Sequence, residues 1–309
     1  MLPFTLQQLR ILKALATEKN FTKAAEILYL SQPLLSKQLK NLEKSLGIIL
    51  LNRENNKISL TENGKVFLEY SERILALCEE SCRALVDLQN GDRGYLIIGA
   101  SQTIGTYFMP RMLTLFAQNN SQINLKVYVN STKLIMKSIL NQEIDIAVVG
   151  GEISDDLKKN LNIEQFVYDE LNLIVSKSHP FAKKTIIKKE DLYYLDFITL
   201  NSNSSIKKFI DNRLIQSKIV VNELKTILQL NSIEGIKTAV SLGLGAAFLS
   251  SSVIEKEVKL KRIKILKIEN IKIMRKLSIV SSSECYKSKA FIIFYNDLIR
   301  LKDKVKRYN

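Results

Sequence analysis

The sequence contains little of the chemistry that catalysis or metal binding requires. Its 309 residues include one histidine, His179, three cysteines and no tryptophan. A single histidine cannot supply a zinc ligand set, and any Ser–His–Asp arrangement would have to use it. Because His179 lies in a Ser-His-Pro-Phe segment beside a lysine pair, we interpret it as an exposed turn residue. We therefore expect no metal, no cofactor and no enzyme activity.

Disulfides, membrane segments and targeting peptides are also missing from the pattern. Cys78 and Cys82 lie four residues apart and Cys285 lies far along the chain, which makes no disulfide framework. No apolar run approaches the roughly 18 residues that a membrane span needs. Glu18 and Glu26 interrupt the first thirty residues, which resemble neither a secretory signal nor a transit peptide. We expect a soluble protein of a reducing compartment.

The positive charge is unevenly distributed. The net charge is +15, yet residues 1–90 hold 12 basic and 10 acidic residues, residues 91–157 hold 5 and 6, and residues 158–309 hold 29 and 15. A basic half-chain can attract anions or raise nonspecific affinity for DNA. The 35 Lys, 37 Ile and 23 Asn are also typical of an AT-rich genome, so charge alone does not identify a partner.

The first sixty residues predict three helices and a hairpin. Apolar spacing indicates a helix over 5–16, then a short helix capped by Thr22, then a third helix from Ser31 to Gly47. The third helix buries one leucine face, made of Leu35, Leu39, Leu42 and Leu46. Residues 49–51 and 57–60 flank a polar segment, which predicts a wing.

This order is typical of a helix-turn-helix, whose second helix enters the major groove. A plain three-helix bundle with a solvated lysine face is the alternative from pattern alone. The expected DNA contacts are Gln32, Pro33 and Ser36 at base edges, and Lys37, Lys40, Arg53 and Lys57 at phosphates.

A long helix is expected from Thr61 or Asn63 onward. Its seam residues recur by three and four, which is typical of a surface that pairs with another helix. Cys78 and Cys82 lie beside this seam and are interpreted as packed thiols, with a redox switch as the alternative. The seam consists of Phe67, Tyr70, Ile74, Leu77, Ser81, Ala84 and Leu88.

Beyond a polar hinge at 90–94, strands alternate with helices, which predicts two parallel α/β units. Expected strands are 95–99, 125–129, 144–149, 171–176, 197–200, 246–249 and 263–266, with 277–281 and a helix over 288–306 returning to the first unit. Two units imply a cleft at the strand ends, where helix N-termini favour anions. Ordinary helix capping is the alternative for each polar residue there. The expected effector-binding residues are Ser101, Gln102, Thr103, Thr132, Thr199, Asn201, Ser202 and Asn203.

Residues 5–64 resemble the N-terminal domain of the LysR-type transcriptional regulators. The matching segments are FTKAAE at 21–26, LSQPLLSKQL at 30–39, LEKSLG at 42–47 and LTENG at 60–64. The resemblance extends over the whole chain and is greatest to plastid-encoded members thought to regulate the rubisco operon.

The resemblance implies a fold and a set of partners. The fold is a winged helix-turn-helix over 1–62 (helix-turn-helix 22–41), a linker and dimerisation helix over 63–90, and a two-lobed α/β effector domain over 94–306, similar to periplasmic binding proteins. Lobe I would be 94–164 and 270–306, and lobe II 165–269. The partners are double-stranded DNA, a small anionic metabolite (sugar phosphate, organic acid or NADPH), further copies of the chain as a dimer or tetramer, and RNA polymerase. The location would be the chloroplast stroma.

Three alternatives remain open. One is a LysR-type regulator of another operon in the cytoplasm of an AT-rich bacterium. Another is a solute-binding protein, although the expected N-terminal domain argues against it. The last is an α/β enzyme, for which one histidine and the absence of a nucleophile elbow leave little chemistry.

Overall fold

The computed structural model describes residues 2–54, 57–90, 94–151 and 153–307; the side chains of 53, 54, 57, 86–90 and 304–307 lie outside this description. Its contacts form two compact units: an N-terminal unit of residues 1–90 with 140–143, and a C-terminal unit of 91–139 with 144–309. No helix within these ranges has the length and apolarity that crossing a bilayer requires.

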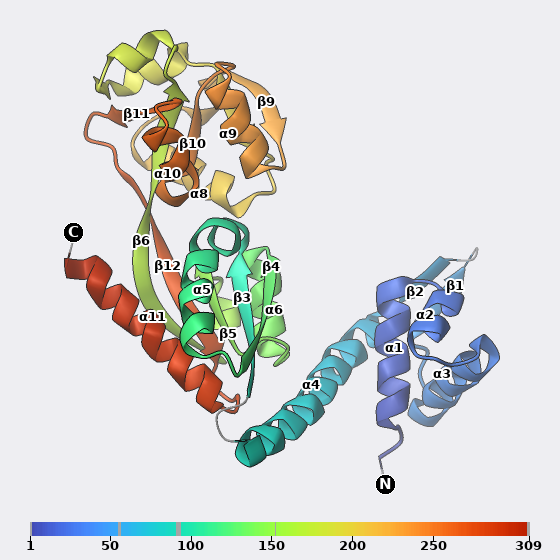
Figure 1. Cartoon of the computed structure of the whole chain (residues 1–309). Helices are drawn as coiled ribbons and strands as arrows, with labels where there is room; N and C mark the ends of the chain where they lie inside the picture. The colour runs from blue at the N-terminus through green and yellow to red at the C-terminus, as the bar shows by residue number, and fades with distance from the viewer. Residues whose placement is uncertain (1, 55–56, 91–93, 152, 308–309) are drawn as a thin grey trace. The chain divides into compact units, whose positions relative to one another are not determined.

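The N-terminal unit contains the predicted helices and hairpin (Figure 1). Its elements are α1 (Leu6–Glu18), α2 (Phe21–Ile27), α3 (Gln32–Leu46), β1 (Leu51–Glu54), β2 (Lys57–Leu60) and α4 (Glu62–Asn90). Ser31 caps α3, and Gly47 ends it with a left-handed φ of 68°. The prediction that Thr22 caps α2 is wrong. Asn20 takes that position, because its extended backbone lets its side chain accept a hydrogen bond from the Lys23 N–H at 3.0 Å.

The core of this unit forms where the first three helices meet. Ala24 and Ala25 are buried at the helix crossing, and their small side chains let the helices approach closely. Leu35, Leu39 and Leu42 of α3 are fully buried there as predicted, whereas Leu46 is only half-buried at the edge. Burying one face of α3 leaves its opposite face in solvent.

The C-terminal unit has two lobes. Lobe I contains the parallel strands β3 (Gly94–Ser101), β4 (Ile123–Asn130) and β5 (Ile146–Gly150). Its helical segments are the π-helical turn η1 (Ile104–Phe108), α5 (Met109–Asn119), α6 (Thr132–Leu140), α7 (Asp155–Lys158) and the C-terminal α11 (Lys289–Arg307).

Lobe II contains a second set of strands and helices. Its strands are β7 (Ile186–Ile187), β8 (Phe197–Leu200), β9 (Thr226–Leu230), β10 (Ala247–Ser250) and β11 (Ile263–Ile268). Its helical segments are η2 (Pro180–Lys183), η3 (Lys189–Tyr194), α8 (Ser205–Gln216), η4 (Val221–Glu223), α9 (Ile233–Ser241) and α10 (Ser251–Lys259).

Two long antiparallel strands run through both lobes: β6 (Leu161–Ser176) and β12 (Ile273–Ser282) (Figure 1). The strands expected at 171–176 and 277–281 are parts of these longer strands. The expected parallel pairing is confirmed for β3, β4 and β5 and for β8 and β9, but the strands that join the lobes are antiparallel. In the main sheet, ordered β4-β3-β5-β12-β6-β11-β7, β12 is antiparallel to β5 and β6, and β10 and β11 are antiparallel to β6.

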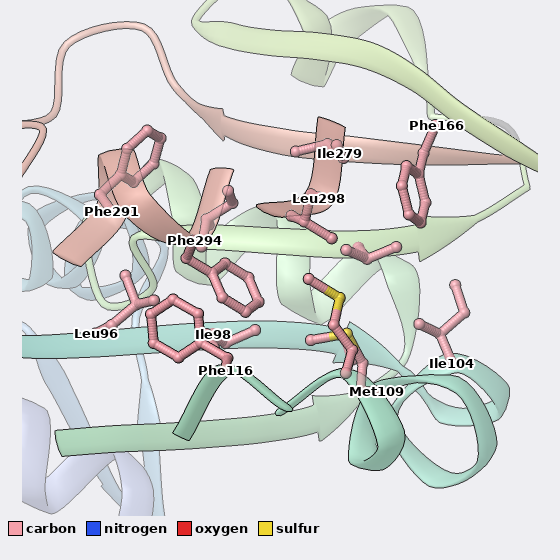
Figure 2. Packing of buried hydrophobic residues seen from close by; sticks show 14 of the residues in the cluster. Leu96, Ile98, Ile104, Met109, Phe116, Phe166, Ile279, Phe291, Phe294 and Leu298 are labelled. Atoms are coloured by element: carbon pink, nitrogen blue, oxygen red, sulfur yellow. The ribbon is translucent and has the colours of Figure 1, made fainter. Parts of the chain in front are cut away.

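Lobe I is closed by the C-terminal helix. Figure 2 shows Phe294 and Leu298 of α11 directed toward the strand residues Leu96 and Ile98, and Phe291 of the same helix belongs to the same buried cluster. Phe294 meets Phe116 of α5 edge to face, with ring centroids 5.1 Å apart. The end of the chain thus completes the core that supports the first half of the cleft.

Candidate functional site

The polar face of α3 is exposed along its length. Gln32, Pro33, Lys37 and Lys40 are exposed, and Ser36 is half-buried beside Leu35. The Ser31 hydroxyl accepts a hydrogen bond from the Leu34 N–H at 3.4 Å and fixes where this helix begins. Side chains in the first turns of such a helix can reach base edges while the lysines meet phosphates.

The hairpin is held beside α3 and α4 by the side chains of Glu43 and Thr61, which bond to backbone groups. A carboxylate oxygen of Glu43, on α3, accepts from the N–H groups of Leu50 and Leu51 at 2.9 and 3.2 Å. The Thr61 hydroxyl donates to the Ile49 carbonyl at 2.8 Å and accepts from the Gly64 N–H at 2.9 Å. These bonds place β1 and β2 beside α3.

Arg53 and Lys57, the residues predicted on the wing, lie on β1 and β2. Strand β1 pairs with β2 in antiparallel register, and Lys57 lies opposite Glu54. The side chains of Arg53 and Lys57 lie outside the described part of the chain, so their role at phosphates stays a prediction.

The apolar seam of α4 is only partly covered by its own chain. Tyr70 and Leu77 are more than half exposed, and so are Val66 and Leu85 beside them. Phe67 packs edge to face on Phe4 at 5.5 Å. An apolar stripe this exposed on one helix is typical of a surface covered by a partner.

A cavity of about 840 Å³ lies between the two lobes. Polar side chains of both lobes line it, including most of the residues that the sequence predicts there: Ser101, Gln102, Thr103, Thr132, Asn201 and Asn203. The N-termini of α6 and α8 open onto it, with Ser131 and Ser204 as their capping side chains. Lys133 and Arg275 add positive charge, and no carboxylate is among the described lining residues.

Two predicted residues lie away from this cavity. Ser202 is exposed and is not part of the lining, and Thr199 lines a separate small cavity of about 60 Å³ inside lobe II. The structure therefore does not bring these two residues together with the other six, and their role in effector binding stays a prediction. Thr199 belongs to β8, so its side chain points into the lobe, whereas Asn201 and Asn203 follow the strand's end.

Arg275 is the cleft residue that sequence analysis missed. It is 2% exposed and donates from Nη2 to Oδ2 of Asp169 at 2.6 Å. The second oxygen of Asp169 accepts from the Ser250 hydroxyl at 2.6 Å. Arg275 Nε is buried and has no hydrogen-bond partner among the described residues. The guanidinium lies close to Gly150, where an added Cβ would come within 3.1 Å of Cζ and Nε.

Two more polar groups at the cleft lack partners. The hydroxyls of Ser101 and Thr103 are buried and make no hydrogen bond to the described residues. Buried polar groups are usually satisfied, so these donors and Arg275 Nε fit a bound anion that accepts hydrogen bonds. Thr132 differs, because its hydroxyl already donates to the Gly150 carbonyl at 3.2 Å.

A polar cluster joins the lobes elsewhere. The Tyr107 phenol of η1 donates to Glu234 of α9 at 2.6 Å. Lys237, which is buried, pairs with Glu234 at 2.8 Å and with Glu257 at 3.1 Å. Burial and the bond to the Glu234 carboxylate raise the pKa of Tyr107, while Lys237 holds the pKa of Glu234 below its usual range. The cluster therefore stays hydrogen-bonded and charged near neutral pH.

His179 lies at a turn in lobe II. His179 is half-buried rather than exposed, because its Nδ1 accepts from the Phe181 N–H at 3.2 Å and caps the η2 turn. Burial lowers its pKa, which the Asp196 carboxylate partly opposes. Within the described ranges, no group of histidine, cysteine and carboxylate side chains is arranged to hold a metal ion.

A helix-turn-helix with an exposed polar helix and a hairpin, followed by two lobes around a polar cavity, defines a DNA-binding regulator with a separate ligand-binding domain. Residues 6–65 match the family described as "Bacterial regulatory helix-turn-helix protein, lysR family", and residues 89–299 match the "LysR substrate binding domain". The chain belongs to the LysR family of transcriptional regulators.

Several full-length relatives are named "Probable RuBisCO transcriptional regulator". The relative from Phaeodactylum tricornutum is 73% identical over 305 residues, which is 99% of each chain. That from Thalassiosira pseudonana is 66% identical over 98% of this chain and 99% of its own. That from Porphyra purpurea is 51% identical over 97% of this chain and 95% of its own.

Solved structures share the fold at lower identity. Full-length OxyR from Pseudomonas aeruginosa is 21% identical, with a TM-score of 0.72 over 96% of this chain and 94% of its own. CbnR complexed with its target DNA is also 21% identical, with a TM-score of 0.70 over 96% of this chain and 99% of its own. The two-lobed fold behind a helix-turn-helix is therefore common to these proteins.

Proposed function

We propose that this regulator controls transcription of the rubisco operon in the plastid stroma, in response to a small anionic metabolite. The identity of 73% over nearly the whole chain with a relative named for this role carries the proposal. The N-terminal domain binds the promoter, and the two lobes, which the sequence delimits as 94–164 with 270–306 and 165–269, bind the metabolite.

The DNA contacts follow from the exposed face of α3. Gln32, Pro33 and Ser36 read base edges in the major groove, while Lys37 and Lys40 hold the flanking phosphates. Arg53 and Lys57 on the hairpin supply further phosphate contacts. The exposure of the first-turn residues and of both lysines supports this assignment.

The metabolite carries a phosphate or carboxylate group in the cavity between the lobes. The unpartnered hydroxyls of Ser101 and Thr103 and the free Nε of Arg275 support an anionic ligand. The amides of Asn201 and Asn203 suit sugar hydroxyls as well as charged oxygens. A sugar phosphate, an organic acid or NADPH therefore fits the lining.

The metabolite acts by binding one lobe arrangement more tightly than another. A ligand shifts a conformational equilibrium only through such a difference in affinity. By linkage, operator DNA and metabolite then change each other's affinity by the same factor. Pairing of two copies along the exposed seam of α4 gives two DNA-binding domains, and RNA polymerase is the further partner of the assembly.

The decisive experiment measures binding to a fragment upstream of the rubisco operon and to random DNA, over a range of salt concentrations. It is repeated with ribulose bisphosphate, NADPH and inorganic phosphate. We expect specific binding that one of the metabolites shifts. Tight binding to another promoter, but not to this one, would discard the rubisco target and keep the family. Loss of all preference over random DNA would contradict operator recognition itself.

A pair of substitutions on α3 separates base reading from phosphate binding. We expect Lys37→Ala to weaken binding to operator and random DNA alike and to lower the salt dependence by about one phosphate contact. We expect Ser36→Ala, which removes a single hydrogen bond, to cost about 0.5–1.5 kcal/mol at one base position and little on random DNA. Titration of both variants against single-base operator variants measures this. Equal losses for both variants on both kinds of DNA would contradict the assignment.

A further inference from the structure

Two segments of lobe II, 177–189 and 256–267, hold 11 of the chain's basic residues and one carboxylate, Glu257. We propose that the surface they form, the lobe II basic surface, binds the phosphate backbone of double-stranded DNA beyond the stretch held by α3. The proposal rests on the proposed function, because it concerns a second contact to DNA that the same chain already binds.

The two segments form one continuous surface. Strand β11 pairs in parallel with β7, with Lys267 opposite Ile186. The Lys177 N–H donates to the Arg262 carbonyl at 3.0 Å, which joins the end of β6 to the start of β11 (Figure 1). Basic side chains that lie far apart in the sequence are therefore held together by backbone hydrogen bonds.

Most of these cations are free to bind another molecule. Lys177, Lys261, Arg262, Lys264 and Lys267 are all exposed, and in the described ranges none of them has an ion-pair partner within 4 Å. Two others are paired inside the chain. Lys184 is 3.3 Å from Asp191, and Lys259 is 2.6 Å from Glu255.

The one carboxylate of the two segments does not neutralise the surface. Glu257 is half-buried and pairs with the buried Lys237 at 3.1 Å, on the side of α10 that faces α9. Its charge is therefore balanced within the lobe. The exposed carboxylates of Glu190, Glu255 and Glu269 flank the two segments, and Glu255 pairs with Lys259. The surface therefore keeps an excess of positive charge toward solvent, which attracts an extended polyanion.

Genome composition does not account for this concentration of charge. A bias toward lysine codons would raise lysine along the whole chain, yet residues 91–157 hold only 5 basic residues. The 25 residues of the two segments hold 11. The clustered lysines and arginine occupy exposed positions around β7 and β11, so their charges remain in solvent and do not destabilise the lobe.

DNA is the polyanion that these observations favour. Lysines without a fixed hydrogen-bond geometry suit phosphates, and they carry no base-reading pattern. Such contacts are weak alone, with dissociation constants of roughly 10⁻⁴–10⁻⁶ M at physiological salt. Once α3 holds the operator, the second contact becomes intramolecular and has an effective concentration up to the millimolar range. An acidic protein docking around the exposed Leu260 and Ile186 is the competing outcome.

The test compares two triple variants of the full chain. The first is Lys261→Gln, Arg262→Gln, Lys264→Gln on the lobe II basic surface. The matched control is Lys159→Gln, Lys218→Gln, Lys276→Gln, which removes the same charge from exposed positions outside the two segments. Urea unfolding and circular dichroism of both variants verify that each remains folded.

Binding is measured against salt on two fragments: the operator alone, and the operator extended by roughly 20 bp on each side. On the extended fragment we expect the slope of log affinity against log salt to be smaller by about 2–3 for the first variant only. On the operator alone, all three proteins should have equal slopes. Equal slopes on both fragments would overturn the proposal. The proposal would also be overturned if the first triple variant bound DNA as the wild type does but no longer activated transcription by RNA polymerase. That result would assign the surface to contact with a protein.

Failure of the proposed function is visible separately. It appears as absence of operator preference in the wild-type protein, before any variant is compared. A wild-type protein that prefers its operator, while the first triple variant behaves as the control does, contradicts only the lobe II contact.

Discussion

Replacement of Gly64 by alanine is expected to abolish operator binding and to lower the stability of the N-terminal domain by about 3 kcal/mol. In an ordinary helix this change would stabilise by roughly 0.5–1 kcal/mol. Here a Cβ would lie 2.0 Å from the Leu50 carbonyl oxygen and 2.9 Å from its carbon. Backbone atoms cannot rotate away as a side chain does, so the start of β1 must move away from α4. The expected loss of stability is therefore at the upper end of the roughly 1–3 kcal/mol that an added methyl group costs in a packed core.

Gly64→Ala is expected to impair DNA binding because it displaces the hairpin. Moving Leu50 breaks the bonds that Thr61 and Glu43 make to residues 49–51, and these bonds hold the wing beside α3. Gly47→Ala is the matched control: it strains a φ of 68° at a position with nothing within 4 Å, for about 1–2 kcal/mol. Urea unfolding and operator titration measure both variants. Equal losses for Gly47→Ala and Gly64→Ala would contradict the close-approach argument.

Replacement of Arg275 by methionine is expected to lower the stability of the effector domain by about 3–5 kcal/mol and to remove metabolite binding. Its partner Asp169 is 9% exposed, so the substitution leaves a buried carboxylate with only the Ser250 hydroxyl. An unpaired buried charge costs several kcal/mol, more than the intact pair contributes.

A double variant separates the two effects. Arg275→Met with Asp169→Leu removes both charges, and replacing a buried pair by apolar side chains is often neutral. We expect stability near that of the wild type and no response to the metabolite, measured by urea unfolding and calorimetric titration. A double variant that still binds the metabolite with wild-type affinity would show that Arg275 has no role in recognition.

The DNA-binding half could be predicted from the sequence because its determinants are local. The leucine spacing of α3, the Ser31 cap and Gly47 each act within a few residues, and the helix formed between them. Thr22 failed as a cap because Asn20, two residues earlier, competes for the same role with the same chemistry. Asn and Thr have similar N-cap preferences, so the sequence pattern does not decide which of two such residues, two positions apart, begins the helix.

The cleft was only partly predictable, because it depends on contacts between distant segments. Loop residues after strands, such as Ser101 and Asn203, were found from the rule that strand ends meet. Arg275 gave no such signal: it lies inside a strand, and its partner Asp169 is 106 residues away. In a strand, Arg275 shares its face with Ile273 and Leu277, whereas Lys276 lies on the other face. This alternation, which turns an arginine toward the buried face, is the signal that was available.

The pair also lies at a mechanically particular place. Asp169 and Arg275 are opposite each other on β6 and β12, the strands that run through both lobes, and the register shifts just beyond them, between Lys276 and Ser278. Changing the angle between the lobes must bend this pair of strands, and the Arg275–Asp169 bond across the pair resists that bending. An anion that draws Arg275 away from Asp169 would therefore make the pair easier to bend. Ligand recognition and bending stiffness then reside in the same two side chains.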